Sequence, residues 1–348
     1  MSARLKTLLQ YTIIIAATAA LIWFSLRGLP VAEGENKWDY LLRTWNNANK
    51  GWLLTMAVIA LLSHAVRAER WRMLMASSGY TTKRSYSFYS LMVGYLVNLV
   101  IPRGGELSRC YNLYKLDKTP VETSFGTVVV ERIVDLICLV ILICLSFIIE
   151  SQKLFGFIET LPISTSGHGD KLILLVYLLV ACVIFAVIFY FIFTRNERVR
   201  AFIIKTWNGF KGGLLSIVIL PNKSLFIFYS ALIWFLYFLT SYTVLKAFPT
   251  TSDLGFGAVL SLFAIGSIAM AAPLPGGTGS YHVLVPQGLV LLYNVPQGDA
   301  VAFTFIFHGW QTAIMIVCGA VSLLATSYHI KRKALAETTN TTTEDQSR

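Results

Sequence analysis

Two groups of polar and charged residues interrupt the apolar stretches of this chain. The first lies around Pro102 and contains Asn98, Arg103, Gly104, Gly105, Glu106 and Arg109. The second lies in the first turns of an apolar run and contains Glu131, Arg132 and Asp135. An ionisable residue inside an apolar span is costly, so such groups indicate either a functional site or a paired network that is purely structural.

The arginines and carboxylates indicate what chemistry these groups can perform. A guanidinium group has paired N–H donors that suit phosphate oxygens. If the chain is helical after Gly105, then Arg103, Glu106 and Arg109 share one face, and the backbone N–H groups of residues 104–105 are free to bind an anion. We predict a site for an anionic headgroup, in which the carboxylates orient the arginines, bind a coupling proton or contact an amine. The alternative is a network that only fixes one helix to its neighbour.

A second break, rich in proline and glycine, occurs in the C-terminal half. It spans Pro273–Gly279 and includes Pro275, Gly276 and Gly277, and it is followed by His282. The turn at 276–277 can offer backbone N–H groups from the other half of the protein. His282 is a candidate site residue because it follows this break, with a hydrogen-bonded packing role as the alternative. His308 receives less weight.

The composition decides the class of protein. Of the 348 residues, 55% are hydrophobic and 14% are charged, whereas soluble domains carry about 25% charged residues. This excludes an ordinary soluble enzyme, a disordered protein and a small disulfide scaffold. Apolar runs of the length that a membrane span needs, about 20 residues, occur at Leu8–Leu26, Thr123–Ile149, Leu172–Thr194, Leu225–Phe248 and Ala300–Thr326, and Gly51–Val66 reaches that length with its flanks.

Basic residues are distributed unevenly along the chain. They gather at the N-terminus, in Arg67–Ser87, in Arg195–Ser224 and after Lys331, and the positive-inside rule places these segments in the cytoplasm. An even number of crossings must then separate Arg67–Ser87 from Arg195–Ser224, although three apolar segments lie between them. Phe88–Ile101 is only 14 residues long and ends at Pro102. We therefore predict that Phe88–Lys118 enters the membrane and returns to the same side.

The C-terminal half repeats this pattern, with an apolar run at Leu254–Ala272 that ends at the second break. We predict an all-α polytopic membrane protein with about six transmembrane helices and two re-entrant helical hairpins in an inverted repeat, or about eight spans by hydropathy alone. One membrane domain covers residues 1–333, with repeats at about 51–149 and 225–327, and residues 334–348 form a disordered cytoplasmic tail. The alternative is that proline and glycine only kink ordinary spans.

The sequence resembles the lysylphosphatidylglycerol synthase transmembrane-domain family of flippase-like membrane proteins. The resemblance covers roughly residues 5–330 and rests on Arg67–Arg72, Gly94, Asn98, Pro102, Arg103, Gly105, Glu106, Arg109, Glu131, Arg132, Asp135, Pro275, Gly276, Gly277 and Gly279. It implies an inner-membrane protein that moves a lipid or lipid-linked molecule between leaflets. Two-part members of the family carry a separate lysyl-transfer domain, for which we expect no room in this chain. The sequence departs from the family at His282, where the resemblance implies a glutamate.

Our leading expectation is a lipid flippase or transporter that moves an anionic phospholipid or a lipid-linked intermediate, with the acyl tails left in the bilayer. We expect it to be no enzyme, to need no cofactor or metal, and to bind membrane lipids rather than nucleic acid. We place it in the cytoplasmic membrane with both termini in the cytoplasm. Two alternatives remain open: a non-catalytic membrane subunit that docks a separate synthase or transferase, and an intramembrane lipid-phosphate enzyme that uses Glu106 or Asp135 as acid or base.

Overall fold

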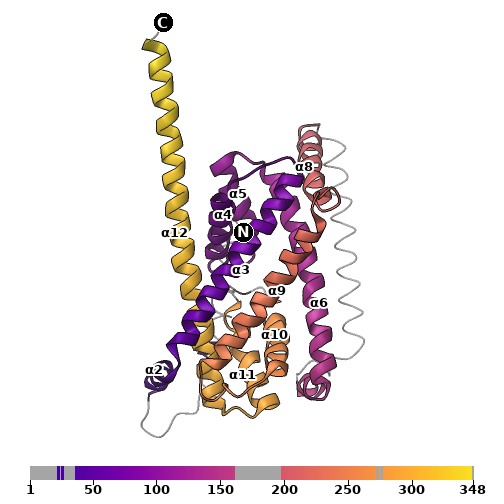
Figure 1. The fold of residues 1–348 in the computed structure, drawn as a ribbon, viewed down its shortest axis with the longest axis vertical. Helices are drawn as coiled ribbons and strands as arrows, with labels where there is room; N and C mark the ends of the chain where they lie inside the picture. The colour runs from indigo at the N-terminus through magenta and orange to yellow at the C-terminus, as the bar shows by residue number, and fades with distance from the viewer. Residues whose placement is uncertain are drawn as a thin grey trace, which may run out of the picture.

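The computed structural model describes residues 22–23, 25–26, 36–160, 197–271, 274 and 277–346, and the regular elements in these ranges are helices (Figure 1). They are α2 (Lys37–Asn47), α3 (Lys50–Ser77), α4 (Arg84–Asn98), α5 (Gly105–Asp117), α6 (Val121–Thr160), α8 (Glu197–Leu215), α9 (Lys223–Lys246), α10 (Phe256–Ala271), α11 (Ser280–Tyr293) and α12 (Gln297–Gln346). The prediction of an all-α protein is confirmed for the described residues.

Four of the described helices are long and apolar enough to cross a membrane. They are α3, the Val121–Leu154 part of α6, α9 and the Gln297–Lys333 part of α12. Each coincides with a predicted span. The predicted spans at Leu8–Leu26 and Leu172–Thr194 lie outside the described residues, apart from residues 22–23 and 25–26.

Two pairs of shorter helices form broken hairpins. At the usual rise of 1.5 Å per residue, the 15-residue α4 is about 22 Å long and the 13-residue α5 about 20 Å, against a hydrocarbon core of about 30 Å. The chain reverses between them through Arg103, whose φ of 60° lies in the left-handed region. The α10–α11 hairpin is built in the same way, with Gly277 and Gly279 at positive φ in its turn.

The packing links the two halves of the bundle. In the centre, α3 and α9 run side by side (Figure 1). The α4–α5 hairpin packs against α12, and the α10–α11 hairpin packs against α6. Each hairpin therefore lies against the last long helix of the other half of the chain.

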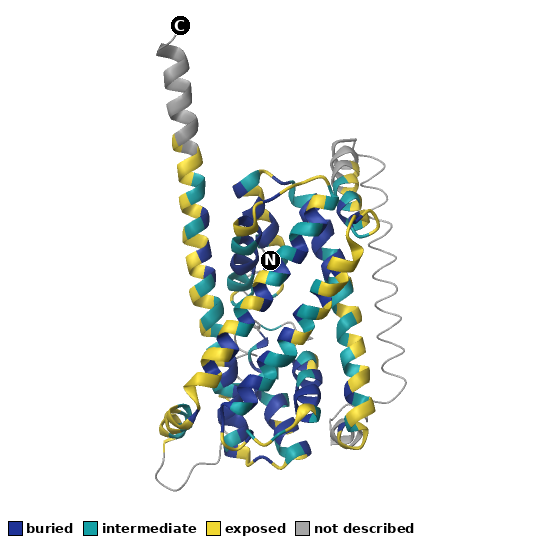
Figure 2. Cartoon of the chain, in the orientation of Figure 1, coloured by how far each residue is buried: buried dark blue, intermediate teal, exposed yellow. Residues whose placement is uncertain are grey.

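Buried residues occupy the faces where the helices meet, and exposed apolar residues follow the outside (Figure 2). Ile141 and Ile148 on α6 are 60% and 78% exposed, and Leu324 on α12 is 71% exposed. Large apolar side chains on an outer surface are typical of a protein whose surroundings are lipid.

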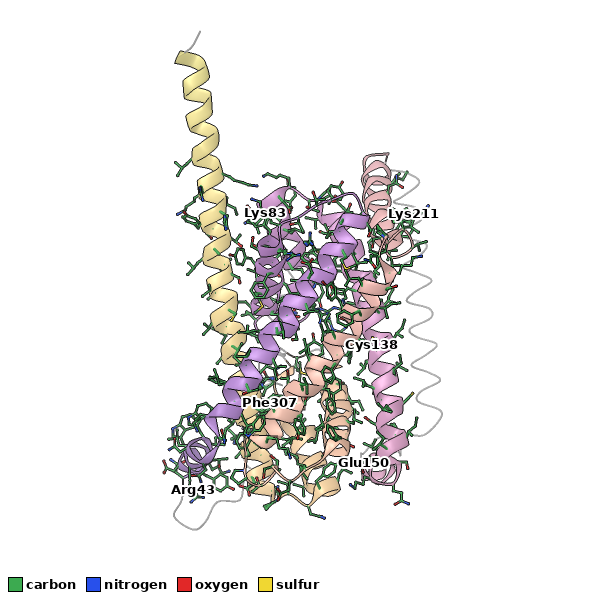
Figure 3. The ribbon with its side chains drawn as sticks, viewed as in Figure 1. Arg43, Lys83, Cys138, Glu150, Lys211 and Phe307 are labelled. Carbon is green, nitrogen blue, oxygen red and sulfur yellow. The ribbon has the colours of Figure 1, made fainter. Side chains whose placement is uncertain are left out.

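Three of the described basic segments lie toward the same end of the bundle. Lys83 and Lys211 lie at one end, and Arg43 and Glu150 lie at the other (Figure 3). α12 runs toward the Lys83 end, where Lys333 Nζ donates a hydrogen bond to the carbonyl oxygen of Leu116 at 2.6 Å. Segments that the charge distribution assigns to one side of the membrane thus share one end of the bundle.

Two segments have a structure that their composition does not indicate. Arg67 and Arg70 begin a segment that the charge distribution places in the cytoplasm, and α3 continues through them and leaves them only 5% and 0% exposed. The reason is that both have carboxylate partners on α6. At the other end of the chain, α12 continues as helix to Gln346, where the composition of 334–348 predicts disorder. Adding a residue to an existing helix costs far less than nucleating one.

Candidate functional site

Glu131 is the centre of a buried ionic network. This α6 residue has no exposed side-chain surface, and it accepts hydrogen bonds from Arg67 Nε and Arg109 Nη2, each at 2.6 Å. Arg70 Nη2 lies 3.6 Å from the same carboxylate. One carboxylate on α6 therefore holds guanidinium groups from α3 and α5.

Asp135 extends the network by one helical turn. It accepts from Arg67 Nη2 at 2.5 Å and from Arg70 Nη2 at 2.7 Å. Arg132 Nη1 lies 3.8 Å from the same side chain, three residues away on α6. Glu131 and Asp135 can share Arg67 because residues four apart lie on one face of a helix.

Arg132 and Glu106 form the most accessible part of the network. Arg132 Nη2 lies 3.0 Å from Glu106 Oε1, and the two side chains are 41% and 24% exposed. Glu106 Oε2 is buried and has no hydrogen-bond partner among the described residues. This pair can therefore exchange partners more readily than the fully enclosed contacts of Glu131.

Aromatic and hydroxyl side chains fix the enclosed arginines. The Arg109 guanidinium lies 4.4 Å from the centre of the Trp71 ring, a cation–π arrangement, and Trp71 Nε1 donates to Thr127 Oγ1 at 2.9 Å. Arg67 Nη1 donates to the Tyr237 hydroxyl at 2.9 Å, and Arg70 Nη1 donates to Ser230 Oγ at 3.1 Å. The α3 arginines are thus bonded to α9 as well as to α6.

The network carries a surplus of positive charge. Among the described residues it joins four arginines (Arg67, Arg70, Arg109 and Arg132) to three carboxylates (Glu106, Glu131 and Asp135). An unbalanced charge away from water is costly. A bound anion would balance it, and Arg132 is the arginine that such an anion can reach.

A cavity of about 910 Å³ adjoins this pair, and we call it the tip cavity because the ends of both hairpins line it. The first half contributes Asn98, Arg103, Glu106 and Arg132, and the second half contributes Met270, His308, Gln311, Thr312 and Met315. The lining residues Leu107, Ile133 and Leu136 are themselves exposed on the outside of the bundle. The tip cavity therefore opens laterally between α5 and α6.

A second cavity of about 330 Å³, the inner cavity, lies among α3, α4, α9, α10, α11 and α12. Arg67 and Tyr237 line it, so the ionic network reaches this cavity too. Five residues line both cavities: Tyr95, Met270, His308, Gln311 and Met315. The two spaces are therefore adjacent. Both volumes are within the usual range for small-molecule sites, about 300–1,000 Å³.

The first hairpin turn is fixed by its own hydrogen bonds. Asn98 Oδ1 accepts from the Gly105 N–H at 2.8 Å, and the Ile101 carbonyl oxygen accepts from the Gly104 N–H at 2.9 Å. The prediction that these two amides are free for an anion is therefore wrong. A Cβ on Gly105 would lie 2.2 Å from the Gly94 carbonyl oxygen, so glycine is required for the close approach of α4 and α5.

The described part of the second turn contacts the cavities through Met270. Pro275 and Gly276 lie outside the described residues. Gly277 has a φ of 72°, and a Cβ there would lie 1.9 Å from Met270 Sδ, whose side chain lines both cavities. Gly277 thus supports a lining residue.

His282 has the surroundings of a packing residue. It is 4% exposed, its Nδ1 accepts a hydrogen bond from the Gly279 N–H at 3.3 Å, and its ring lies 4.8 Å from that of His308. His282 is absent from the described lining of the tip and inner cavities, and His308 is present in both.

Sequence reasoning gave too little weight to several residues. Arg67 and Arg70 lie three residues apart after an apolar run, which is the same signal that identified Glu106 and Arg109. His308 and Gln311 are also three apart in a span. Arg103 lines the tip cavity, but its left-handed backbone places it before α5 rather than on the face of Glu106 and Arg109. The described residues include no cluster of ligands suited to a metal ion.

The fold and this network define a multi-pass, all-helical membrane protein with a buried ionic site. The sequence pattern of the lysylphosphatidylglycerol synthase TM region matches residues 7–319. The chain belongs to this family, which confirms the resemblance drawn from its motifs.

Two curated relatives are similar to the chain. It is 29% identical over 100 residues to the UPF0104 membrane protein MJ1595 of Methanocaldococcus jannaschii. The aligned region is 28% of this chain and 30% of that protein. It is 25% identical over 308 residues to the glycosyltransferase AglD of Haloferax volcanii. The aligned region is 80% of this chain and 49% of that protein. The chain thus spans about a third and about half of the lengths of these relatives. No solved structure matches it.

Proposed function

We propose that this protein is a lipid flippase or transporter that moves an anionic phospholipid or a lipid-linked intermediate between membrane leaflets. The observation that carries the proposal is the tip cavity, which residues from both hairpins line beside the accessible arginine of a network with surplus positive charge. Its lateral opening between α5 and α6 would admit a headgroup from the bilayer.

The Glu106–Arg132 pair is the binding element in this proposal. A phosphate group would replace Glu106 as the partner of Arg132, and it would balance the charge surplus with paired hydrogen bonds. Asn98 and Arg103 face the same space from the hairpin turn. Glu131 and Asp135 hold the remaining arginines in place, and the protein performs no covalent step.

The helix contacts support the inverted repeat that such a transporter requires. In the proposed repeat α3–α6 correspond to α9–α12, so the packing of α4 on α12 corresponds to that of α10 on α6, and α5 on α6 to α11 on α12. The two short hairpins would enter from opposite faces and meet near the bilayer midplane, as broken helices do in many secondary transporters. With the predicted spans at 8–26 and 172–194, the chain makes six crossings.

The positive-inside rule gives the orientation. The end of the bundle that carries Lys83 and Lys211 (Figure 3) would face the cytoplasm together with both termini. The membrane would be the cytoplasmic one. The protein's partners in this proposal are lipids with anionic headgroups.

The test is leaflet exchange by the purified protein in vesicles. We expect exchange of an anionic or a polyprenyl-phosphate lipid, but not of a zwitterionic one, and we expect Arg132→Ala to abolish it. Arg72→Ala is a matched control, because Arg72 pairs with Glu69 at 2.5 Å, is 31% exposed and lines neither cavity. Exchange that is equally fast in wild type and Arg132→Ala would refute the site.

The match to AglD favours a second candidate function. This chain covers about half of a protein that is named for glycosyl transfer, so the membrane region occurs there in one chain with further sequence. In this alternative, the protein is a non-catalytic membrane subunit that docks a separate transferase. Folded protein that exchanges no lipid class but copurifies with one transferase would favour it over transport.

A further inference from the structure

We propose that the inner cavity receives one long apolar chain of the lipid whose anionic headgroup binds in the tip cavity. This inference rests on the proposed function and specifies its substrate as an amphiphile held at both ends. It departs from the sequence-based expectation that the tails stay in the bilayer.

The continuity of the two spaces is the first observation. Tyr95, His308 and Gln311 line both cavities, so a molecule whose headgroup contacts Arg132 can extend past them into the inner cavity. Arg67 and Tyr237 lie on the inner cavity side of the same network. The polar groups therefore lie close to the junction between the two spaces.

The character of the inner cavity wall is the second observation. Val244, Leu262, Val285, Phe303 and Phe307 come from α9, α10, α11 and α12, and all of them line the cavity and belong to one buried apolar core. Polar side chains such as Arg67 and Tyr237 also line the cavity, but this apolar part of the wall offers no hydrogen bonds to hold water. Protein interiors also keep few voids larger than a water molecule. An apolar chain fills such a space and gains dispersion contacts along its length.

The geometry explains why the occupant is a chain rather than a second headgroup. A phosphate in the inner cavity would lose its hydration against the apolar walls, with Arg67 already bonded to Glu131, Asp135 and Tyr237. An alkyl or isoprenoid chain has no hydration shell of this kind to lose. The alkyl and isoprenoid chains are equally apolar, so the experiment uses one probe of each kind.

The test is photolabelling of the full-length protein in phosphatidylcholine vesicles. One probe is phosphatidylglycerol with a diazirine at the end of an acyl chain, and the other is a polyprenyl phosphate with a diazirine at the end of its chain. We expect one of them to label inner-cavity residues such as Val244, Phe303 or Phe307. Labels confined to exposed residues that line neither cavity, such as Ile141 or Ile148, or no label on the protein, would overturn the inference.

Variants that fill the inner cavity sharpen the test. Val244→Phe and the less buried Ser241→Phe would each displace part of the chain, and exclusion of two methylene groups corresponds to about a tenfold weaker occupancy. Val290→Phe is the matched control, because Val290 packs against the same core without lining the cavity. Equal labelling in all three folded variants would contradict the proposal.

Exchange measurements separate this inference from the proposed function. If the inference holds, Ser241→Phe slows the exchange of long-chain lipids but not of a short-chain analogue with the same headgroup. If lipid exchange is absent in wild type but the inner cavity is labelled, the proposed function fails and the chain site stands. If exchange requires Arg132 but the inner cavity is never labelled, the function stands and the chain site fails.

Discussion

Neutralisation of Glu131 is expected to destabilise the whole bundle. Glu131 has no exposed surface and accepts hydrogen bonds from Arg67 and Arg109 at 2.6 Å, with Arg70 at 3.6 Å. In Glu131→Gln these three guanidinium groups remain buried, and Asp135 is left as the carboxylate partner of Arg67 and Arg70. Arg109 loses its only ion-pair partner among the described residues.

The expected magnitude follows from burial. Removing one partner of a buried ion pair costs about 3–5 kcal/mol, which is a large share of a typical folding free energy of about 5–15 kcal/mol. Glu106→Gln removes the same charge from a pair whose side chains are 24% and 41% exposed, where the loss is about 0–1 kcal/mol. The two variants therefore separate the stabilising carboxylate from the accessible one.

The assay is heating in detergent, followed by measurement of the fraction that remains monodisperse. We compare the order in which the variants lose their fold on heating. Large proteins often unfold irreversibly, so their melting temperatures do not convert directly to free energies of unfolding. We expect Glu131→Gln to lose its fold at a clearly lower temperature than wild type, and Glu106→Gln to follow wild type. Adding Arg109→Gln to Glu131→Gln should cost less than the two single losses together, since the pair is coupled. A Glu131→Gln variant as stable as Glu106→Gln would refute the reasoning.

The remaining predictions concern the first hairpin. Gly105→Ala should destabilise the protein by about 1–3 kcal/mol, because the new Cβ would lie 2.2 Å from the Gly94 carbonyl oxygen. Gly212→Ala has no atom within 4 Å and should melt like wild type; equal melting of both variants would contradict the close approach. In a variant without native cysteines, Val100→Cys should resist a membrane-impermeant reagent added from the face of Arg43, because the α4–α5 hairpin is too short to cross. Arg43→Cys is the positive control, and labelling of both from that face would show that the hairpin spans the membrane.

Local sequence features determined the class of protein and the position of its long helices. Apolar runs at Thr123–Ile149, Leu225–Phe248 and Ala300–Thr326 predicted α6, α9 and α12 because a span needs about 20 apolar residues in one stretch. Proline and glycine around residues 102–105 predicted the break between α4 and α5 because these residues interrupt a helix. The network of Glu106, Glu131 and their arginines was also predicted in part.

Tertiary structure decided which charges are buried and what they contact. Arg67 and Arg70 looked like cytoplasmic anchors, since the sequence does not show that α3 passes beside Glu131 and Asp135, more than 60 residues away. His282 drew more weight than His308 because it follows the second break, but the packing of α11 on α12 places His308, not His282, in the lining of the cavities. Helix periodicity is local, whereas the angle and depth at which two helices cross depend on side chains from both. The tip and inner cavities exist only where several helices meet, so the sequence could name some of their residues but not the space that these residues enclose.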